Sequence, residues 1–270
     1  MSETTTLSGA GRRITLLTDF GTADGYVAAM KGVIASIASA AIIDDASHDI
    51  APGDIRSASW ALGAYWRLYP PGTVHVAVVD PGVGSERRPL AFEVEERIII
   101  APDNGLVTEV LLGSEFTHAV EVRNLPLLRG DISATFHGRD VFAPAAALIL
   151  AGLTLPEVGP TVTDPVLLKS SAPVRDGDAI IGTVVHVDRF GSLITDIPGA
   201  AVSGGYVEVE GGPTLPLLRT YTDVDSGDGV ALIGSRGFVE VSVRDRNAAG
   251  ILGVGRGAVI RWRVTPPAAK

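Results

Sequence analysis

The chain has 270 residues, of which 46% are hydrophobic and 20% charged, and its mean hydropathy is +0.30. This size and composition fit one large globular domain or two unequal ones and exclude a coiled coil or a disordered chain. The formal net charge of -9 disfavours binding to nucleic acid or to an anionic membrane, because no basic surface displaces counterions. The chain has no cysteine, so its chemistry must come from carboxylate, histidine, arginine, hydroxyl or backbone groups.

The N-terminus is small and polar and lacks the apolar core of a signal peptide. No apolar run reaches the roughly 18 residues that a membrane-spanning helix needs. We therefore expect a disordered tail over residues 1–13, a cytoplasmic location and no membrane partner.

Residues 14–165 alternate short apolar runs with segments of helical spacing. The predicted strands lie at 14–18, from 41–43 onward, and at 73–79, 90–94 and 97–101. The predicted helices lie at 26–37, 55–69, 106–112 and 142–150. Strands that alternate with helices predict an α/β N-terminal domain with a mostly parallel central sheet between helices.

The pattern changes after about residue 162, where proline, serine and an Asp-Gly-Asp turn predict a linker over residues 166–178. Beyond it, short β-type runs are broken by Gly, Pro or Asp, and no long helical pattern occurs. The predicted strands lie at 179–187, 206–209, 230–234, 238–243 and 258–264. We therefore predict a smaller all-β C-terminal domain, a barrel or a sandwich, over residues 179–270.

Two predicted strands end in an aspartate, and ligands of open α/β sheets bind beyond the carboxyl ends of the strands. Asp19 follows the first strand. Asp80 follows the third, in VVDPGVGSERR, where a Pro-Gly-Val-Gly turn brings Arg87 and Arg88 close behind it. A carboxylate and a guanidinium at a tight turn can form a polar reaction site. The alternative is a solvated hairpin with a surface ion pair.

Two further segments of this domain carry candidate side chains. Asp24 follows Asp19 by five residues in DFGTADGY, so both carboxylates can reach one pocket, although Asp24 or Thr22 can instead cap the next helix. In TFHGRD, His137 stands between Phe and Gly and can point at a ligand, although a lone histidine is more often structural. We interpret Asp140 as the N-cap and dipole partner of the following helix.

Acidic residues gather in SHDIAPGD, which contains His48, Asp49 and Asp54 and follows Asp44 and Asp45. Capping of the next helix explains Asp54, and no two histidines recur at ligand spacing, so we expect no metal. The turn PGVGSER lacks the Gly-Lys-Ser/Thr ending of a phosphate loop and leads into a strand, which disfavours phosphate binding.

In the second domain, polar side chains stand at predicted turns. Asp188 precedes a Phe-Gly turn in VDRFGSLITDI, and Ser235 and Arg236 lie in GSRGFVEV. Arg246 begins RNAAG, which exposes small-residue backbone, and Tyr221 lies in RTYTDV, where an aromatic ring can stack on a flat ligand. Each of these turns also fits an ordinary hairpin.

Six motifs occur in order: TDFGTADGY, VVDPGVGSERR, APDNG, TFHGRD, DRFGSLITDI and GSRGFVEV. From about residue 14 to residue 264, the chain resembles the S-adenosyl-L-methionine hydrolase (adenosine-forming) family. That family is also called S-adenosyl-L-methionine hydroxide adenosyltransferase and is related to fluorinase and chlorinase. The resemblance implies an α/β domain, a smaller β domain, no cofactor, and a homotrimer. In such trimers each active site lies between one subunit's N-terminal domain and its neighbour's C-terminal domain.

The resemblance implies attack of water or hydroxide at the ribose C5′ of S-adenosyl-L-methionine, which yields adenosine and L-methionine. The family's catalytic set falls on Asp80, Arg87 and His137. A sulfonium leaves as a neutral thioether, so no general acid is required and the enzyme must activate the nucleophile. Arg87 supplies positive charge, Asp80 holds Arg87 and orients water, and His137 accepts or relays the proton. The residue types leave open which group takes that proton.

Substrate contacts carry over by motif position. Asp19 resembles the acceptor of the ribose diol, and Tyr221 resembles the aromatic residue that stacks on adenine. The positions around the methionine amine and carboxylate are Asp24, Asp188, Ser235 and Arg236. The positions similar to contacts of the adenine edge are Ser192, which stands where an Asn is common, and the backbone at Arg246 and Ala248.

The chain departs from fluorinase in ways that bear on the nucleophile. Asp80 replaces a Tyr and Gly138 replaces a halide-contacting Ser, so a carboxylate should repel a halide anion and we predict a hydrolase. Gly53 stands where fluorinase has a Trp over the ribose, and Asp196 replaces an Asn. Two alternatives are an adenosine- or S-adenosyl-L-methionine-binding protein with negligible catalysis and a halide-dependent adenosyltransferase.

Overall fold

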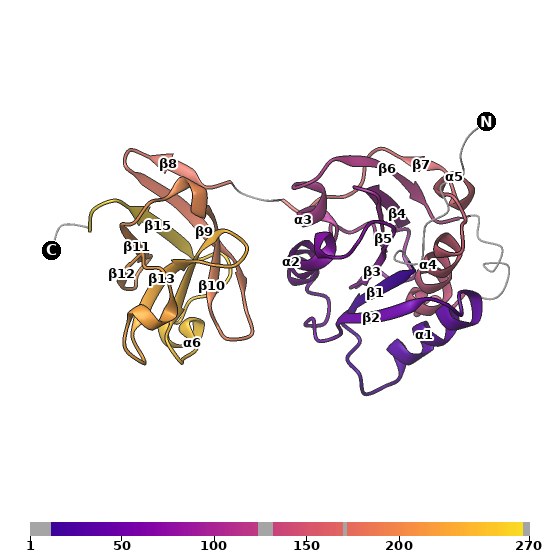
Figure 1. The fold of residues 1–270 in the computed structure, drawn as a ribbon, viewed down its shortest axis with the longest axis horizontal. Helices are drawn as coiled ribbons and strands as arrows, with labels where there is room; N and C mark the ends of the chain where they lie inside the picture. The colour runs from indigo at the N-terminus through magenta and orange to yellow at the C-terminus, as the bar shows by residue number, and fades with distance from the viewer. Residues whose placement is uncertain (1–11, 124–131, 170–171, 267–270) are drawn as a thin grey trace. The chain divides into compact units, whose positions relative to one another are not determined.

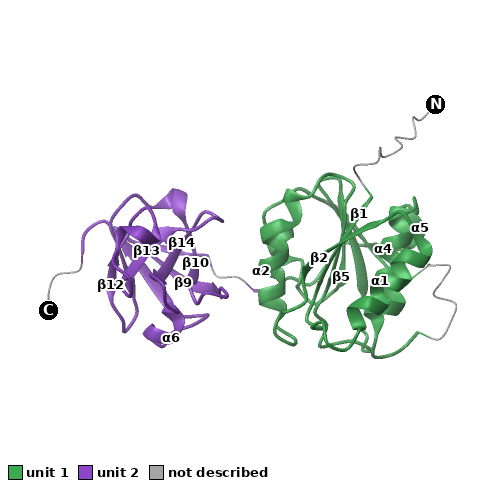
Figure 2. Cartoon of the chain, turned by 60° about the horizontal axis from the view of Figure 1, so that its bottom comes forward, with its two compact units in different colours: residues 1–168 green, residues 169–270 purple. Residues whose placement is uncertain are grey.

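The computed structural model describes residues 12–123, 132–169 and 172–266. The chain forms two compact units, Met1–Leu168 and Lys169–Lys270 (Figure 2). The predicted tail lies outside the described residues except for its last two, of which Arg13 begins the first strand. The predicted linker includes residues 170–171, which also lie outside, and the predicted domain limits stay predictions. No described helix is long and apolar enough to cross a membrane.

The first unit is built on a seven-stranded sheet with the order β2-β1-β3-β5-β4-β6-β7 (Figure 1). Its strands are β1 (Arg13–Thr18), β2 (Ile42–Ser47), β3 (Val74–Val78), β4 (Pro89–Val94), β5 (Arg97–Pro102), β6 (Phe116–Glu121) and β7 (Thr161–Val162). Its helices are α1 (Tyr26–Ile37), α2 (Ile55–Tyr65), α3 (Thr108–Leu111), α4 (Ala143–Leu150) and α5 (Leu155–Val158). A 3₁₀ turn, Trp66–Leu68, ends the helix predicted at 55–69, and a π-helical turn, Gly138–Phe142, precedes α4.

Helices cover both faces of this sheet because successive strand residues point to opposite sides. Ile14 and Leu16 of β1 pack in the same buried cluster as Met30 of α1, whereas Leu17 packs in a second cluster with Leu62 of α2. Figure 2 shows α1, α4 and α5 on one side of the sheet and α2 on the other. The predicted arrangement of a central sheet between helices is confirmed.

The sheet is mixed, with a parallel half and an antiparallel half. In the described chain, β2, β1, β3 and β5 pair in parallel, and the pairings of β4 with β5, β4 with β6 and β6 with β7 are antiparallel. The antiparallel half begins at a two-residue hairpin loop, Glu95 and Glu96, with φ values of 47° and 61°. The prediction of parallel strands is therefore confirmed for the half of the sheet that carries Asp19 and Asp80.

The second unit is an antiparallel sheet with the order β12-β11-β15-β9-β10-β14-β13, to which β8 adds by pairing with β9. An isolated bridge between Leu217 and Ala231 brings its two ends together, so the barrel is nearly closed. This confirms the predicted β domain. The strands are β8 (Val174–Asp176), β9 (Ala179–Val187), β10 (Leu193–Pro198), β11 (Tyr206–Val209), β12 (Thr214–Pro216), β13 (Gly229–Ile233), β14 (Phe238–Val243) and β15 (Val259–Arg263), with a short helix α6 (Ala248–Leu252).

Candidate active site

Three predicted catalytic side chains form one hydrogen-bonded chain in the first unit. Asp80 follows β3, Arg87 precedes β4, and His137 is the residue before the π-helical turn. Arg87 donates from Nε to Asp80 Oδ2 at 2.8 Å, and its Nη2 lies 2.6 Å from the same oxygen. The same Nη2 lies 2.6 Å from His137 Nδ1.

The Asp80–Arg87 pair is buried and His137 is half-buried, so the alternative of a solvated surface pair is wrong. The Asp80 and Arg87 side chains are 4% and 9% exposed, and the Arg87 guanidinium lies 5.3 Å from the centre of the Phe142 ring. A buried pair of this kind is stable only with good geometry and further hydrogen bonds, which the two-point contact and His137 supply.

The turn between Asp80 and Arg87 packs closely against the segment that carries His137. Gly84 has φ +78°, and a Cβ there would lie 2.4 Å from the carbonyl oxygen of Ala134. Ser85 closes the turn, since its N–H and its hydroxyl both donate to Gly82 O at 3.1 and 2.7 Å. Gly84 therefore allows two segments that are distant in sequence to meet.

Burial and the positive charge of Arg87 lower the pKa of His137, while the more distant Asp80 and Asp140 carboxylates oppose the shift. The imidazole is therefore neutral at pH 7. Because Arg87 can only donate, His137 Nδ1 must be the acceptor and Nε2 carries the proton.

A cavity of about 50 Å³ adjoins these groups, with room for a water molecule. Among the described residues, Asp80 Oδ1 and Arg87 Nη1 are buried and have no hydrogen-bond partner. The predicted site residues in its wall are Asp19, Asp80 and His137. The other lining residues are Phe20, Val78, Val83, Thr135, Phe136 and Gly138.

Asp19 and Asp24 have different settings. Asp19 Oδ2 accepts a hydrogen bond from Gly53 N at 2.8 Å, which orients the carboxylate. Gly53 has φ +73°, a conformation that a larger residue such as Trp rarely adopts. Asp24 is exposed and does not line the cavity. The alternative prediction that Asp24 or Thr22 caps the next helix is wrong, because the N-cap of α1 is Gly25 and no side chain caps it.

The interpretation of Asp140 as an N-cap is corrected by the structure. Asp140 lies inside the π-helical turn, accepts a hydrogen bond from Ser133 N at 2.9 Å and pairs with Arg139 at 2.6 Å. The Arg139 partner lowers the pKa of Asp140. Asp140 thus closes the loop that presents His137.

The acidic residues near His48 have separate roles. Asp44 pairs with Arg13 at 2.7 Å, Asp45 pairs with Lys31 at 2.6 Å and lies 3.0 Å from His48, and Asp54 caps α2 by accepting from Ser57 N at 3.1 Å. Over residues 12–123, 132–169 and 172–266, no group of three or more histidine or acidic side chains is arranged to hold a metal ion.

The second unit has its own pocket of about 680 Å³. Of the predicted substrate residues, Ser192, Tyr221 and Arg246 line it. Asp188 adjoins them, since its Oδ1 accepts from Ser192 N at 2.8 Å and Phe190 N at 2.9 Å. The buried Ala248 begins α6. A Cβ on Gly191 would lie 2.3 Å from Asn247, so the two loops that carry these residues are in contact.

Below Ser192 and Tyr221 lies a buried polar network that the sequence did not indicate. Tyr221 donates to Glu240 Oε1 at 2.6 Å, and Ser242 lies within hydrogen-bond distance of both Glu240 Oε1, at 2.9 Å, and Ser192 Oγ, at 2.8 Å. Burial and the bond to Glu240 raise the pKa of Tyr221, so the phenol stays neutral. The orientation of the Tyr221 ring is set by this network.

Two predicted residues lie outside the lining of this pocket, and several lining residues were not predicted. Ser235 and Arg236 lie on the turn between β13 and β14 and do not line the pocket. Phe190 does line it and is 78% exposed. An exposed aromatic ring at a pocket is the signal for this residue, but exposure cannot be read from the motif alone. The remaining lining residues are Thr222, Val243, Arg244, Asp245, Asn247 and Ser242.

Together, the fold and these contacts define a two-unit α/β and β-barrel protein with a buried Asp–Arg pair, hydrogen-bonded to a histidine, beyond parallel strands and a ligand-sized pocket in the barrel unit. The chain belongs to the S-adenosyl-L-methionine (SAM) hydroxide adenosyltransferase family. The family's N-terminal domain matches residues 14–159, and its C-terminal domain matches residues 182–261. The predicted family is confirmed.

Full-length relatives and solved structures agree with this assignment. The chain is 40% identical to an (R)-S-adenosyl-L-methionine hydrolase of Thermus thermophilus, over 93% of this chain and 99% of the relative. It is 38% identical to one of Salinispora tropica, over 93% and 97%. A fluorinase of Actinoplanes is 29% identical, over 87% and 91%. A crystal structure of a conserved protein from Thermotoga maritima has a TM-score of 0.86 and 34% identity, covering 93% of this chain and 99% of that one.

Proposed function

We propose that this protein hydrolyses S-adenosyl-L-methionine to adenosine and L-methionine. Support comes from its membership of the family and from full-length relatives named as (R)-S-adenosyl-L-methionine hydrolases. The observation that carries the proposal is the buried Asp80–Arg87 pair, hydrogen-bonded to His137 beside a cavity with room for water.

In the proposed reaction, a water oxygen attacks the ribose C5′ and forms the new C–O bond as the C5′–S bond breaks. The sulfur keeps the electron pair and leaves as the neutral thioether of methionine, and the water loses one proton. The charge on the sulfonium disappears, so no acid is needed at the leaving group. Alignment of the water with C5′ at roughly 3 to 3.5 Å supplies much of the rate.

The geometry favours Asp80 as the group that takes the proton. Asp80 Oδ2 is occupied by Arg87, whereas Oδ1 is buried without a hydrogen-bond partner among the described residues and can accept from water. His137 Nδ1 is occupied by Arg87, which leaves Nε2–H as a donor to the water oxygen. Arg87 stabilises hydroxide character and holds both partners in place.

We further propose that the barrel unit, together with Asp19 and Asp24 of the first unit, binds the adenosine and methionine parts of the substrate. Tyr221 and Phe190 offer flat aromatic faces in the pocket, and Ser192 with the backbone near Arg246 and Ala248 offers polar contacts to the adenine edge. Asp19 takes the ribose hydroxyls, and Asp24, Asp188, Ser235 and Arg236 take the charged groups of methionine.

Because these residues are divided between the two units, we also propose a homotrimer in which one subunit's first unit meets the second unit of its neighbour. The cytoplasmic location expected from the sequence stays a prediction.

The direct test is to incubate the purified protein with S-adenosyl-L-methionine in water enriched in ¹⁸O and to separate the products. We expect equimolar adenosine and methionine, with the label in the 5′-hydroxyl group of adenosine. No product after hours at micromolar protein would overturn the proposal. Tight binding of adenosine by calorimetry without turnover would instead favour the binding-protein alternative.

Halide transfer is a second candidate, because fluorinases are among the relatives. Against it, the Asp80 carboxylate lies where an anion would have to bind, and a Cβ on Gly138 would approach Phe20, Phe136 and Met30 at 3.1 to 3.3 Å. We expect no 5′-halo-5′-deoxyadenosine when the reaction contains fluoride or chloride. Its formation at a rate comparable to that of adenosine would support the halide reaction.

A further inference from the structure

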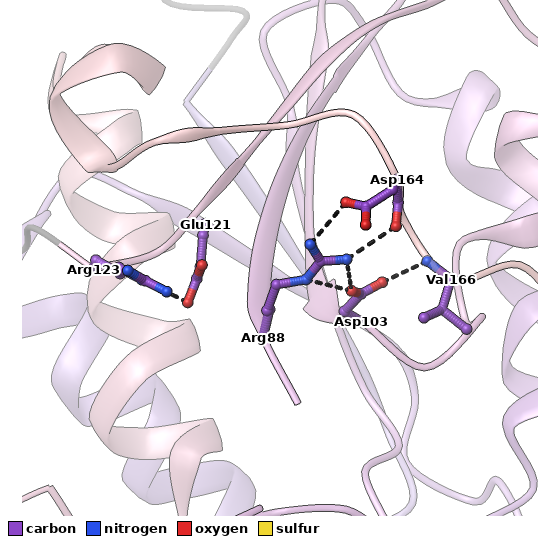
Figure 3. Close-up of polar contacts among 6 residues, drawn as sticks. All are labelled: Arg88, Asp103, Glu121, Arg123, Asp164 and Val166. Atoms are coloured by element: carbon purple, nitrogen blue, oxygen red, sulfur yellow. Dashed lines mark hydrogen bonds and ion pairs between the residues drawn. The ribbon is translucent and has the colours of Figure 1, made fainter. Parts of the chain in front are cut away.

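The motif APDNG and Arg88 have no part in the proposed chemistry, yet they form a polar cluster around the buried Asp103 carboxylate. Asp103, whose side chain is 4% exposed, accepts from Arg88 Nε at 2.8 Å and Nη2 at 2.5 Å. Arg88 also donates to the Asp164 carboxylate at 2.8 Å and to its carbonyl oxygen at 2.9 Å. Figure 3 shows Arg88 between these two aspartates. Asp164 is 79% exposed, so Asp103 is the partner that dominates.

This cluster holds both ends of the turn that carries Asp80 and Arg87. Asn104 Nδ2 donates to the carbonyl oxygen of Val79, the residue before Asp80, at 2.9 Å. Asp103 binds the side chain of Arg88, the residue after Arg87, and its N–H donates to Arg88 O at 2.9 Å. Asp103 and Asn104, two adjacent residues of the turn that follows β5, therefore fix where the Asp80–Arg87 turn begins and where it ends.

The same motif and the nearby Thr108 also hold the last residues of the first unit. The second oxygen of Asp103 accepts from Val166 N at 2.7 Å (Figure 3). Thr108 Oγ1 accepts from Leu168 N at 2.8 Å. Gly105 has φ +94°, and a Cβ there would lie 2.8 Å from the Leu168 side chain. The second unit begins at the next residue, Lys169.

We propose that Arg88, Asp103 and Asn104 are positioning residues that hold the Asp80–Arg87 turn in its reactive geometry and couple it to the segment leading into the second unit. The Asp103 carboxylate is the central link, because one oxygen holds the turn and the other holds residue 166. The proposal rests on the proposed function for the roles of Asp80 and Arg87. The coupling itself concerns the placement of Arg87 against His137 and is measurable without turnover.

The variants Asp103→Asn and Asn104→Asp test this link with little change of shape. In Asp103→Asn, Arg88 loses its buried counter-charge. In Asn104→Asp, the carbonyl oxygen of Val79 faces an acceptor where it had a donor. Because Arg87 lowers the pKa of His137, displacement of Arg87 should raise that pKa. NMR titration of the His137 ring should show an increase in both variants, and kcat should fall at least tenfold with a smaller change in KM.

Arg123→Met and Asp164→Asn are the matched controls. Arg123 pairs with Glu121 at 2.7 Å, is 63% exposed, and lies apart from the cluster in Figure 3. Asp164→Asn removes the exposed partner of Arg88 and leaves Asp103 in place. We expect both controls to keep the His137 pKa and to keep kcat within twofold.

An unchanged His137 pKa in folded Asp103→Asn and Asn104→Asp would overturn the proposal, whatever their activity. A fall in thermal stability with an unchanged pKa would mean that the cluster is merely structural and would overturn it equally. If Asp103→Asn does not fold, Asn104→Asp and Arg88→Met decide by the same titration. If the wild type shows no turnover but the pKa moves as expected, the positioning role stands and the proposed hydrolysis fails.

Discussion

At the scale of single residues, the site depends on which atoms are already occupied. Arg87 Nη2 contacts both Asp80 Oδ2 and His137 Nδ1. The second oxygen of Asp80 and the second ring nitrogen of His137 therefore remain for the water molecule. The proposed division of labour, with Asp80 as base and His137 as donor, follows from this occupancy. The motif positions alone name the three residues but do not separate their roles.

Removal of the Asp80 or His137 side chain should lower the rate of the chemical step much more than the affinity for adenosine. We predict that Asp80→Ala and His137→Ala lower kcat at least tenfold, because the first removes the proton acceptor and the second removes a donor and a contact of Arg87. Adenosine affinity, measured by calorimetry, should stay within a fewfold of wild type. Near wild-type turnover in either variant would remove that residue from the mechanism.

The lowered pKa of His137 has a defined consequence for the pH profile. Below this pKa the imidazole becomes a cation with no acceptor atom, and it repels Arg87. We predict that kcat is constant at neutral pH and falls on acidification, with an apparent pKa below 6.5. A profile of kcat against pH, measured at saturating substrate, checks this. A fall that begins well above pH 7 would contradict the assignment of a neutral His137.

At the scale of elements, a buried polar contact links β1, β3 and α2. His75 of β3 is fully buried, and its Nδ1 lies 2.8 Å from Thr15 Oγ1 of β1, which lies 3.3 Å from Tyr65 Oη of α2. Burial lowers the pKa of His75 to about 3. The folded state therefore keeps this histidine neutral, whereas the unfolded chain takes up a proton below pH 6.5.

This difference predicts how stability depends on pH. The contribution of His75 is fully present above pH 6.5 and is lost progressively as the pH falls toward 3. Between pH 7 and pH 5 the free energy of unfolding of the first unit should fall by about 2 kcal/mol from this group. Urea unfolding at both pH values should show this fall in wild type and a smaller one in His75→Gln. Equal falls in the two proteins would contradict the burial of a neutral His75.

Strands β6 and β7 and the contacts of Asp196 are features that the local sequence pattern did not predict. Strand β6 and the two-residue β7 lack a strong apolar run and exist because β4 and β6 offer edges to pair with. Asp196, whose replacement of an Asn had no evident role, accepts from Thr183 N at 2.8 Å and Oγ1 at 3.1 Å at an irregularity between β9 and β10. Burial raises the pKa of Asp196. These features depend on neighbours far away in sequence.

At the scale of the whole molecule, the proposed catalytic and substrate-binding residues are divided between two units of one chain. Asp80, Arg87 and His137 lie in the first unit, and Tyr221 and Arg236 lie in the second. If each site combines units of two subunits, inactive variants of different units should complement one another.

We predict that Asp80→Asn and Arg236→Ala, each with little activity alone, regain activity when they are unfolded together and refolded. Random mixing in a symmetric trimer leaves about a quarter of the sites with both units intact. Refolding each variant separately is the control, and sedimentation should show a species of three 28.0 kDa chains. Activity that stays at the sum of the separate variants would argue for sites within one subunit.

Read by itself, the sequence determined the two-part architecture, the main strands and helices of the first unit and the family, because periodicity, turn residues and ordered motifs are local properties. It also named Asp80, Arg87 and His137 as candidates. Only the tertiary structure decided that these side chains are in mutual contact with Asp80 and Arg87 buried, that Asp24 does not cap α1, that half of the sheet is antiparallel, and that Asn104 and Asp103 bind the two ends of the turn. Burial and hydrogen-bond occupancy arise between segments tens of residues apart, such as Gly84 against Ala134, and no local pattern encodes them.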